Sequence, residues 1–329
     1  MSDVIACGLV TALGHGWRSS AAAMRAGLSR PWPLELPEVE SLAPITGYAA
    51  RHLTEGKSGA ARLGALLQGA VNDLLTQVTI PEHLTTSFYL AGPEPERGPN
   101  DEVLTGILTE ACAAWPGQQR AAWLRTGRTA FFEAIRRAQD ALAQGRTDLA
   151  VIGGVDSFCE GQSLLPLQQA RRIKNDDDPT GLMPGEAAAL LLLVPNSAQA
   201  RAQLGTPTFS AEPRTQLKRE PSTGVGLERA LSPVLKEHPS EWLLVDQNGE
   251  DYRAGEWGFV LPRLIRAGHA SPELWFPAIS LGDTGVAAPA VSAAWALAAW
   301  DRGYAPAGTA IVCASSDGEA RAACALLHS

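Results

Sequence analysis

The chain has 329 residues, of which 45% are hydrophobic, and a formal net charge of −8. This length allows one large domain or two closely packed ones, and the composition excludes a disordered chain. The acidic balance, without a visible basic stripe, argues against nucleic acid as a partner. Five scattered cysteines lack the spacing of metal ligands and are typical of a reduced, cytosolic protein. They are Cys7, Cys112, Cys159, Cys313 and Cys324.

The first segments predict a strand, a turn and a helix. Residues 4–10 are mostly apolar, residues 11–14 form a small-residue turn, and a helix is expected over residues 18–26. The N-terminal sequence MSDVIACGLV lacks the basic region of a signal peptide, so we expect a cytoplasmic protein. Residues 28–56 are rich in proline and have no clear periodicity, which predicts a surface excursion.

The next segments alternate between helical and extended patterns. Apolar residues at helical spacing predict a helix over residues 57–78, and TTSFYLAG, from Thr85, is typical of a strand. A second helix is expected over residues 101–115, followed by a short strand over residues 121–126.

The stretch from Gly127 to Ser157 has the clearest pattern in the chain and predicts a turn, a helix and a buried strand. Apolar side chains recur at helical spacing from Phe131 to Leu142, and Gly145 ends this predicted helix. The run LAVIG then predicts a strand that is covered on both faces, and the glycine pair 153–154 ends it.

Residues 157–184 predict an irregular segment. Residues 175–178 read Asn-Asp-Asp-Asp, and these oxygen ligands could hold a cation or form a solvated loop; the spacing of an EF-hand is absent. The sequence MPGEAAALLLLV, from Met183, predicts entry into a buried strand. Residues 196–204 predict a helix and a hinge, so we place a boundary near residue 205.

The second half repeats the alternation of strands and helices, which predicts a parallel-dominated sheet in each half. Residues 284–300 carry no charge but are too short for a membrane span and contain proline, so we expect a buried helix. Strands are expected near 207–212, 242–245, 274–278, 309–314 and 321–327, and helices near 222–236, 251–267 and 285–302.

Several of these patterns resemble one enzyme family. A turn, a helix and the pattern G-x-x-D-x-x-x-x-G-G are similar to the N-terminal half of thiolase-fold enzymes, especially the β-ketoacyl synthases. The opening C-G-L-V-T-A-L-G and the entry M-P-G-E-A-A also resemble that family, in which Glu186 would hold a structural glutamate position. The resemblance implies an α/β thiolase fold, in which two similar halves form a five-layered αβαβα sandwich. The halves would be residues 1–205, with excursions at 28–56 and 157–184, and residues 206–329.

The reactive residues of that family are replaced here. The turn that carries its nucleophilic cysteine aligns with Arg128, which stays protonated and cannot accept an acyl group. Its first histidine aligns with Asn248, before Gly249, and its second with Asp283, in the loop G-D-T-G-V-A-A that begins at Gly282. None of the six histidines falls at either position. They are His15, His52, His83, His238, His269 and His328.

If the fold is right, Arg128, Asn248 and Asp283 converge. Such a set could plug the pocket and satisfy its own charges, bind a small polar ligand, or support chemistry of another kind. The resemblance adds Glu186, Gly249, Gly282 and Gly318 as structural residues around this pocket, Gly318 lying in a shortened C-terminal turn. We expect no metal and no cofactor.

These replacements predict a catalytically inactive thiolase-like protein that works by binding another protein. The chain resembles the standalone thiolase-like proteins found beside bacterial type VI secretion effectors, which implies a role in effector loading or maturation and a secreted effector or spike component as partner. Alternatives are a non-condensing partner of an acyl-chain synthase, similar to chain-length factors, or a binder of acyl or CoA-type ligands with altered chemistry. The resemblance also implies a homodimer.

Overall fold

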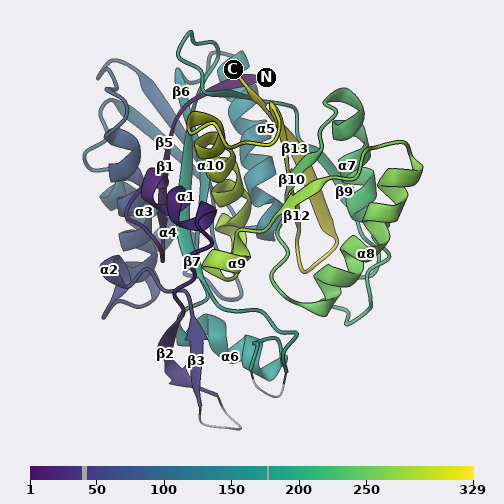
Figure 1. Cartoon of the computed structure of the whole chain (residues 1–329). Helices are drawn as coiled ribbons and strands as arrows, with labels where there is room; N and C mark the ends of the chain where they lie inside the picture. The colour runs from purple at the N-terminus through teal and green to yellow at the C-terminus, as the bar shows by residue number, and fades with distance from the viewer. Residues whose placement is uncertain (39–42, 176–177) are drawn as a thin grey trace.

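The computed structural model describes residues 1–38, 43–175 and 178–329. Its described residues form one 11-stranded sheet in the order β11-β10-β12-β13-β8-β1-β7-β6-β4-β5, with β9 paired to β13 (Figure 1). The strands are β1 (Ser2–Thr11), β4 (Thr85–Ala91), β5 (Gln118–Leu124), β6 (Leu149–Ser157), β7 (Glu186–Val194), β8 (Ala202–Leu204), β9 (Thr208–Ala211), β10 (Trp242–Leu244), β11 (Glu273–Trp275), β12 (Thr309–Ser315) and β13 (Ala320–His328).

Helices cover both faces of each half of the sheet, which makes five layers. Helices α3 (Gly59–Leu75) and α4 (Asp101–Ala111) cover the outer face of the N-terminal half, and α7 (Val225–Glu237) and α8 (Asp251–Arg266) cover that of the C-terminal half (Figure 1). Helices α5 (Ala130–Ala143) and α10 (Ala288–Asp301) lie between the two halves. The predicted α/β fold with five layers is therefore confirmed.

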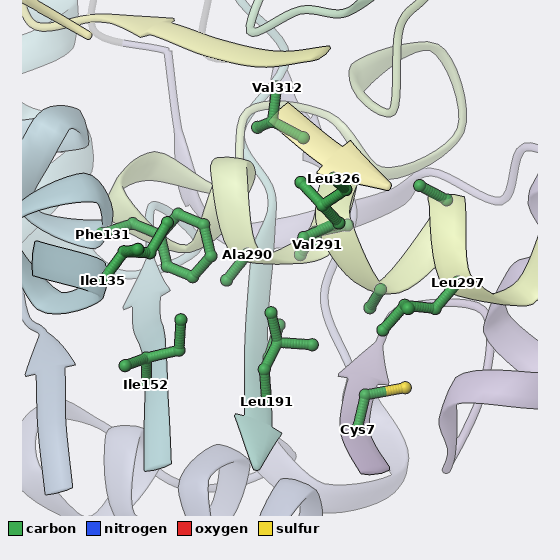
Figure 2. Packing of buried hydrophobic residues seen from close by; sticks show 14 of the residues in the cluster. Cys7, Phe131, Ile135, Ile152, Leu191, Ala290, Val291, Leu297, Val312 and Leu326 are labelled. Atoms are coloured by element: carbon green, nitrogen blue, oxygen red, sulfur yellow. The ribbon is translucent and has the colours of Figure 1, made fainter. Parts of the chain in front are cut away.

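The middle layer is the largest hydrophobic core. Figure 2 shows Phe131 of α5 and Val291 of α10 with Ile152 and Leu191 of the N-terminal half below them and Val312 of the C-terminal half above. Helix α10 is apolar around its whole circumference because it packs against both halves of the sheet. The uncharged stretch predicted as a buried helix is this element. Within the described residues, no helix has the length and apolar character needed to cross a membrane.

The strand directions correct one prediction. Strand β4 runs parallel to β5 and β6, but β7 runs antiparallel to both β1 and β6. In the second half, β10 runs parallel to β11 and β12, but β12 and β13 are antiparallel. The prediction of parallel-dominated sheets was wrong for these pairs because β6 and β7, like β12 and β13, follow each other without a crossover helix on the sheet.

The segment predicted as a helix and hinge before residue 205 contains β8 instead. This strand pairs with both β1 and β13 and so joins the two halves into one sheet. Its alternating burial, with Ala202 and Leu204 inside and Gln203 outside, follows from its place in the sheet, which overrides the helical propensity of the surrounding alanines and glutamines. In the same way, the strand expected to reach residue 278 ends at Trp275, because Pro277 leads into α9 (Ala278–Leu281).

The two predicted excursions contain regular structure that the sequence did not reveal. The described part of residues 28–56 contains the paired strands β2 (Trp32–Pro37) and β3 (Pro44–Gly47), called the hairpin here, and then α2 (Arg51–Thr54). The described part of residues 157–184 contains α6 (Gly161–Gln169). The hairpin and α6 lie together below the sandwich in Figure 1. They share a small separate core, so neither is a free loop. It is formed by Leu34, Leu36, Ile45, Phe158, Leu164, Leu167, Ile173 and Leu182.

The remaining described helices are short or lie at the N-terminal edge. Helix α1 (Trp17–Arg25) packs against α10, and the 3₁₀ turns η1 (Gly127–Thr129) and η2 (Gly285–Ala287) open α5 and α10. The two turns contact each other, which brings the starts of the middle helices together. This meeting point is where the candidate site lies.

A closed charge network as the candidate functional site

The site is built on the elbow between β5 and α5. Gly127 has a φ of 74°, and a Cβ there would lie 2.8 Å from Ser316 Oγ, so the bend requires glycine. The next residue, Arg128, is only 5% exposed and extends toward the start of α10. The elbow therefore buries the arginine that the sequence singled out.

The structure brings together the three residues that the sequence singled out. Arg128 Nη2 donates to Asp283 Oδ2 at 2.5 Å, and its Nη1 donates to the Gly285 carbonyl oxygen at 3.2 Å. Asn248 Nδ2 donates to the same Asp283 oxygen at 2.6 Å, and the Gly285 amide donates to Asp283 Oδ1 at 2.9 Å. Both carboxylate oxygens of Asp283 are thus occupied by protein donors.

A second arginine, Arg172, extends this network on one side. Its Nε and Nη2 donate to the two oxygens of Glu250 at 2.6 Å and 2.9 Å, and its Nη1 donates to Asp317 Oδ2 at 2.6 Å. Glu250 also accepts from Asn248 at 2.8 Å and from Gln216 at 2.6 Å. Asn248 therefore bridges Asp283 and Glu250.

A third arginine, Arg253 of α8, extends it on the other. It donates to Asp246 Oδ2 at 3.0 Å, to the Ser315 carbonyl oxygen at 2.6 Å and to Asp317 Oδ1 at 2.8 Å. Three guanidinium groups and four carboxylates thus form one connected set. The cations are Arg128, Arg172 and Arg253, and the carboxylates are Asp246, Glu250, Asp283 and Asp317.

Most of this network was missed from the sequence. Asp246, Glu250 and Asp317 lie in the loops that the resemblance marked, so their position was a usable signal. Arg172 follows α6, and Arg253 lies on α8, and neither had a sequence signal, because only the tertiary fold brings them to the site.

The network stabilises the charged form of Asp283. Burial alone would raise the pKa of this carboxyl group, but the charge and hydrogen bond of Arg128 outweigh burial and lower the pKa to about 2. The pKa of Arg128 is raised in turn, since Asp283 outweighs the opposite effect of burial. Burial raises the pKa of Asp246, even though Arg253 lies beside it. The Arg128–Asp283 pair therefore stays charged over the physiological range.

This shift predicts an acid-sensitive contribution to stability. Because the pKa of folded Asp283 lies near 2, below the usual 3.8, its contribution is fully present above about pH 4 and is lost as the pH falls through 2. We expect the unfolding free energy of the native protein to fall by about 2 kcal/mol more between about pH 5 and pH 2 than that of Arg128→Met/Asp283→Asn. Urea unfolding of both proteins across this range measures the difference; parallel pH dependences would contradict the assignment.

Almost no space remains at the site. The free volume between Arg128, Asp246, Asn248 and Asp283 is about 10 Å³, which is close to the minimum for a single water molecule. Small-molecule sites usually enclose about 300–1,000 Å³. Of the three alternatives left open by the sequence, the geometry favours a self-satisfied plug over a ligand pocket.

No cysteine or histidine is among the described residues that line this space. All five cysteines are buried, and burial raises the pKa of Cys112 to about 12 and that of Cys159 well above its usual range. The charge of Glu186 also raises the pKa of Cys159, and the charge of Arg62 lowers it by less than burial raises it. Burial therefore disfavours the reactive thiolate form of these cysteines.

Glu186 occupies a second, separate buried cluster. Its Oε1 accepts from the Ala50 amide and from Thr54 Oγ1, both at 2.7 Å, and its Oε2 accepts from Ser157 Oγ at 2.7 Å. Arg62 adds two hydrogen bonds, of 2.6 Å from Nε and 3.0 Å from Nη2. This carboxylate ties α2 and α3 to the start of β7.

The three predicted structural glycines differ in what they require. Gly282 has a φ of 65°, and a Cβ there would lie 2.6 Å from Tyr48 Cδ2, so its loop needs glycine. Gly249 has a φ of 101°. At Gly318 the nearest atom to a Cβ would be Leu217 Cδ1 at 3.7 Å, so space does not impose glycine there.

The possible cation loop shows a turn in its described part. Asn175 Oδ1 accepts from the Asp178 amide, and Asp178 Oδ1 accepts from Thr180. Asp176 and Asp177 lie outside the described residues. Elsewhere in the described ranges, no group of three or more His, Cys, Asp or Glu side chains could hold a metal ion.

Comparisons with known proteins agree with this fold. No protein-family model matches the sequence, and a search of curated proteins gives no match. Among solved structures, the ishigamide ketosynthase/chain length factor aligns with a TM-score of 0.78 and 15% identity, over 100% of this chain and 99% of that one. A type II PKS acyl-carrier protein in complex with its ketosynthase bound to the hexaketide gives 0.78 and 11%, with the same coverage. The ketosynthase from module 6 of the bacillaene synthase from Bacillus subtilis 168 gives 0.77 and 10%, over 100% of this chain and 72% of that one. The chain therefore has the fold of the ketosynthases, the thiolase fold.

Proposed function

We propose that this protein does not catalyse condensation of thioesters and instead acts by binding another protein. The observation that carries the proposal is the Arg128–Asp283 pair, which fills the site where ketosynthase chemistry would need a thiolate and room for an acyl chain. A guanidinium group has no nucleophilic form at physiological pH. Because the fold is kept but the nucleophilic thiolate is missing, we infer that the protein acts through its surface.

The proposal predicts that no acyl group is transferred to the protein. Incubation with acetyl-CoA, a longer acyl-CoA and acyl carrier thioesters should leave the intact mass unchanged, since every described cysteine is buried away from the elbow. Arg128→Cys should remain unable to condense thioesters, because Asn248 and Asp283 stand where the two histidines would be needed. A stoichiometric acyl adduct on the native protein, or turnover by it, would contradict the proposal.

Two kinds of protein partner are to be distinguished. The resemblance to standalone thiolase-like proteins supports a type VI secretion effector or spike component, with a role in effector loading or maturation. The likeness to a ketosynthase/chain length factor supports a condensing synthase, for which this chain would be the non-condensing subunit. Affinity purification from the native host with identification by mass spectrometry separates them: a toxin or spike component favours the first, and a synthase with a carrier protein the second.

We also propose a homodimer, as the resemblance implies. The described sheet ends at β5, whose outer edge is unpaired and could continue into a second copy.

A further inference from the structure

A groove between α1 and α10 lies away from the charge network and has an arginine-rich rim. Figure 1 shows the two helices side by side at the N-terminal part of the sandwich. The groove encloses about 470 Å³, and its floor is apolar. It is lined by Trp17, Arg18, Ala21, Ala22, Arg25, Ala298, Asp301, Arg302 and Tyr304.

Two of the rim arginines rest on aromatic rings instead of carboxylates. The Arg25 guanidinium carbon lies 4.1 Å from the centroid of the Tyr304 ring, and that of Arg18 lies 5.3 Å from the Trp17 ring. A cation–π contact uses the face of the guanidinium plane and leaves its N–H groups at the edge free to donate. These two side chains are therefore held in place without having their hydrogen-bond donors consumed.

The local charge is opposite to that of the whole chain. Arg302 is the third arginine of the rim. Asp301 is paired with Arg201 at 3.1 Å and with Arg302 at 3.9 Å.

Asp301 is the one carboxylate among the described residues that line the groove. Asp73 lies in the field of Arg18, but its Oδ2 accepts from the amides of Leu9 and Trp17. Three arginines thus line the groove against one occupied carboxylate, on a protein with a net charge of −8. This local excess of positive charge marks the groove as a place for an acidic ligand.

We propose that this groove binds an acidic helical segment of a partner protein. Arg18 and Arg25 are seven positions apart on α1, so their Cα atoms are about 10 Å apart along the helix axis and lie on nearly the same face. Carboxylates at the same spacing on a partner helix would meet both, with Arg302 on the opposite rim. The floor of Ala21, Ala22 and Ala298 would take the small apolar side chains between them. The inference rests on the proposed protein-binding function and identifies a surface for it.

A fluorescein-labelled amidated peptide tests the groove directly. Its glutamates are placed seven positions apart, with alanine and leucine between, and its binding to the full-length protein is followed by fluorescence anisotropy as salt is increased. We expect Arg18→Gln/Arg25→Gln/Arg302→Gln to bind about tenfold more weakly and with a reduced salt dependence. The matched control Arg146→Gln/Arg229→Gln/Arg266→Gln has the same change in net charge, on exposed arginines after α5, on α7 and on α8, and should bind like the native protein.

Other outcomes decide against the proposal. Equal affinity of the groove variant and the control variant, or no binding by the native protein, would overturn it. A labelled DNA strand of 20 nucleotides serves as the competing ligand. If it binds the native protein more tightly than the peptide does, and binds the groove variant more weakly, the peptide is not the occupant. Arg18→Lys/Arg25→Lys/Arg302→Lys, which keeps the charge but not the fork of donors, should bind with intermediate affinity and excludes misfolding as the cause. None of these results depends on acyl transfer, so failure here is distinguishable from failure of the proposed inactivity.

Discussion

Replacing Arg128 with methionine should destabilise the protein by about 3–5 kcal/mol, because it leaves the Asp283 carboxylate buried without its cation. Asp283 is 2% exposed, so water cannot replace the lost guanidinium without opening the site. Urea unfolding at about pH 7 measures the change. The effect belongs to the pair and not to the arginine alone, since removal of both charges should restore much of the loss.

The double variant Arg128→Met/Asp283→Asn provides that check. We expect its destabilisation to be smaller than the sum of the two single changes by about 1–3 kcal/mol, because no charge is left buried. Arg136→Met is the matched control: Arg136 is exposed and pairs with Glu133 on the surface of α5, so the change should cost at most about 1 kcal/mol. A loss at Arg128 no larger than at Arg136 would show that the pair does not plug a closed site.

Replacing Glu186 with alanine should have an effect of similar size for a different reason. Five hydrogen bonds converge on this fully buried carboxylate, and one of its donors is the charged Arg62. Its removal leaves the Ala50 amide and the hydroxyls of Thr54 and Ser157 without their acceptor. We expect a loss of about 3–5 kcal/mol, measured by urea unfolding.

Glu55→Ala is the control for this prediction. Glu55 is exposed and pairs with Arg51 one turn away on α2, so its removal should change stability by at most about 0.5 kcal/mol. Because Glu186 ties α2 and α3 to β7, its loss should also speed hydrogen exchange in α2 more than in α7, which lies on the opposite outer face. Uniform exchange in both helices would contradict the local role.

The sequence predicted the fold well where local pattern and burial agree. The helix over residues 130–143 and the strand over residues 149–157 have the periodicity and length of buried elements, and both were found. It failed at β8, where three residues form a strand only because β1 and β13 lie on either side. Strand direction also escaped prediction, because the order of elements along a chain does not fix which strands become neighbours.

The candidate site was predicted only in part, because some of its residues have a sequence signal and others are brought in by the tertiary fold. Arg128, Asn248 and Asp283 could be named because they lie in turns that carry the sequence resemblance, and the fold brings the three together. Arg172 and Arg253 could not. Arg172 contacts Glu250 and Asp317, which are 78 and 145 positions away in the sequence, and Arg253 contacts Asp317, which is 64 positions away. The charge balance that closes the site is thus a property of the folded chain.

The most direct test of the central claim is a crystal structure of the protein after exposure to an acyl thioester. The account predicts that the Arg128 guanidinium still contacts Asp283, with Asn248 beside it, and that no acyl group lies at the elbow. An acyl group bound covalently at the elbow, or a thiol and an imidazole facing each other there, would contradict it.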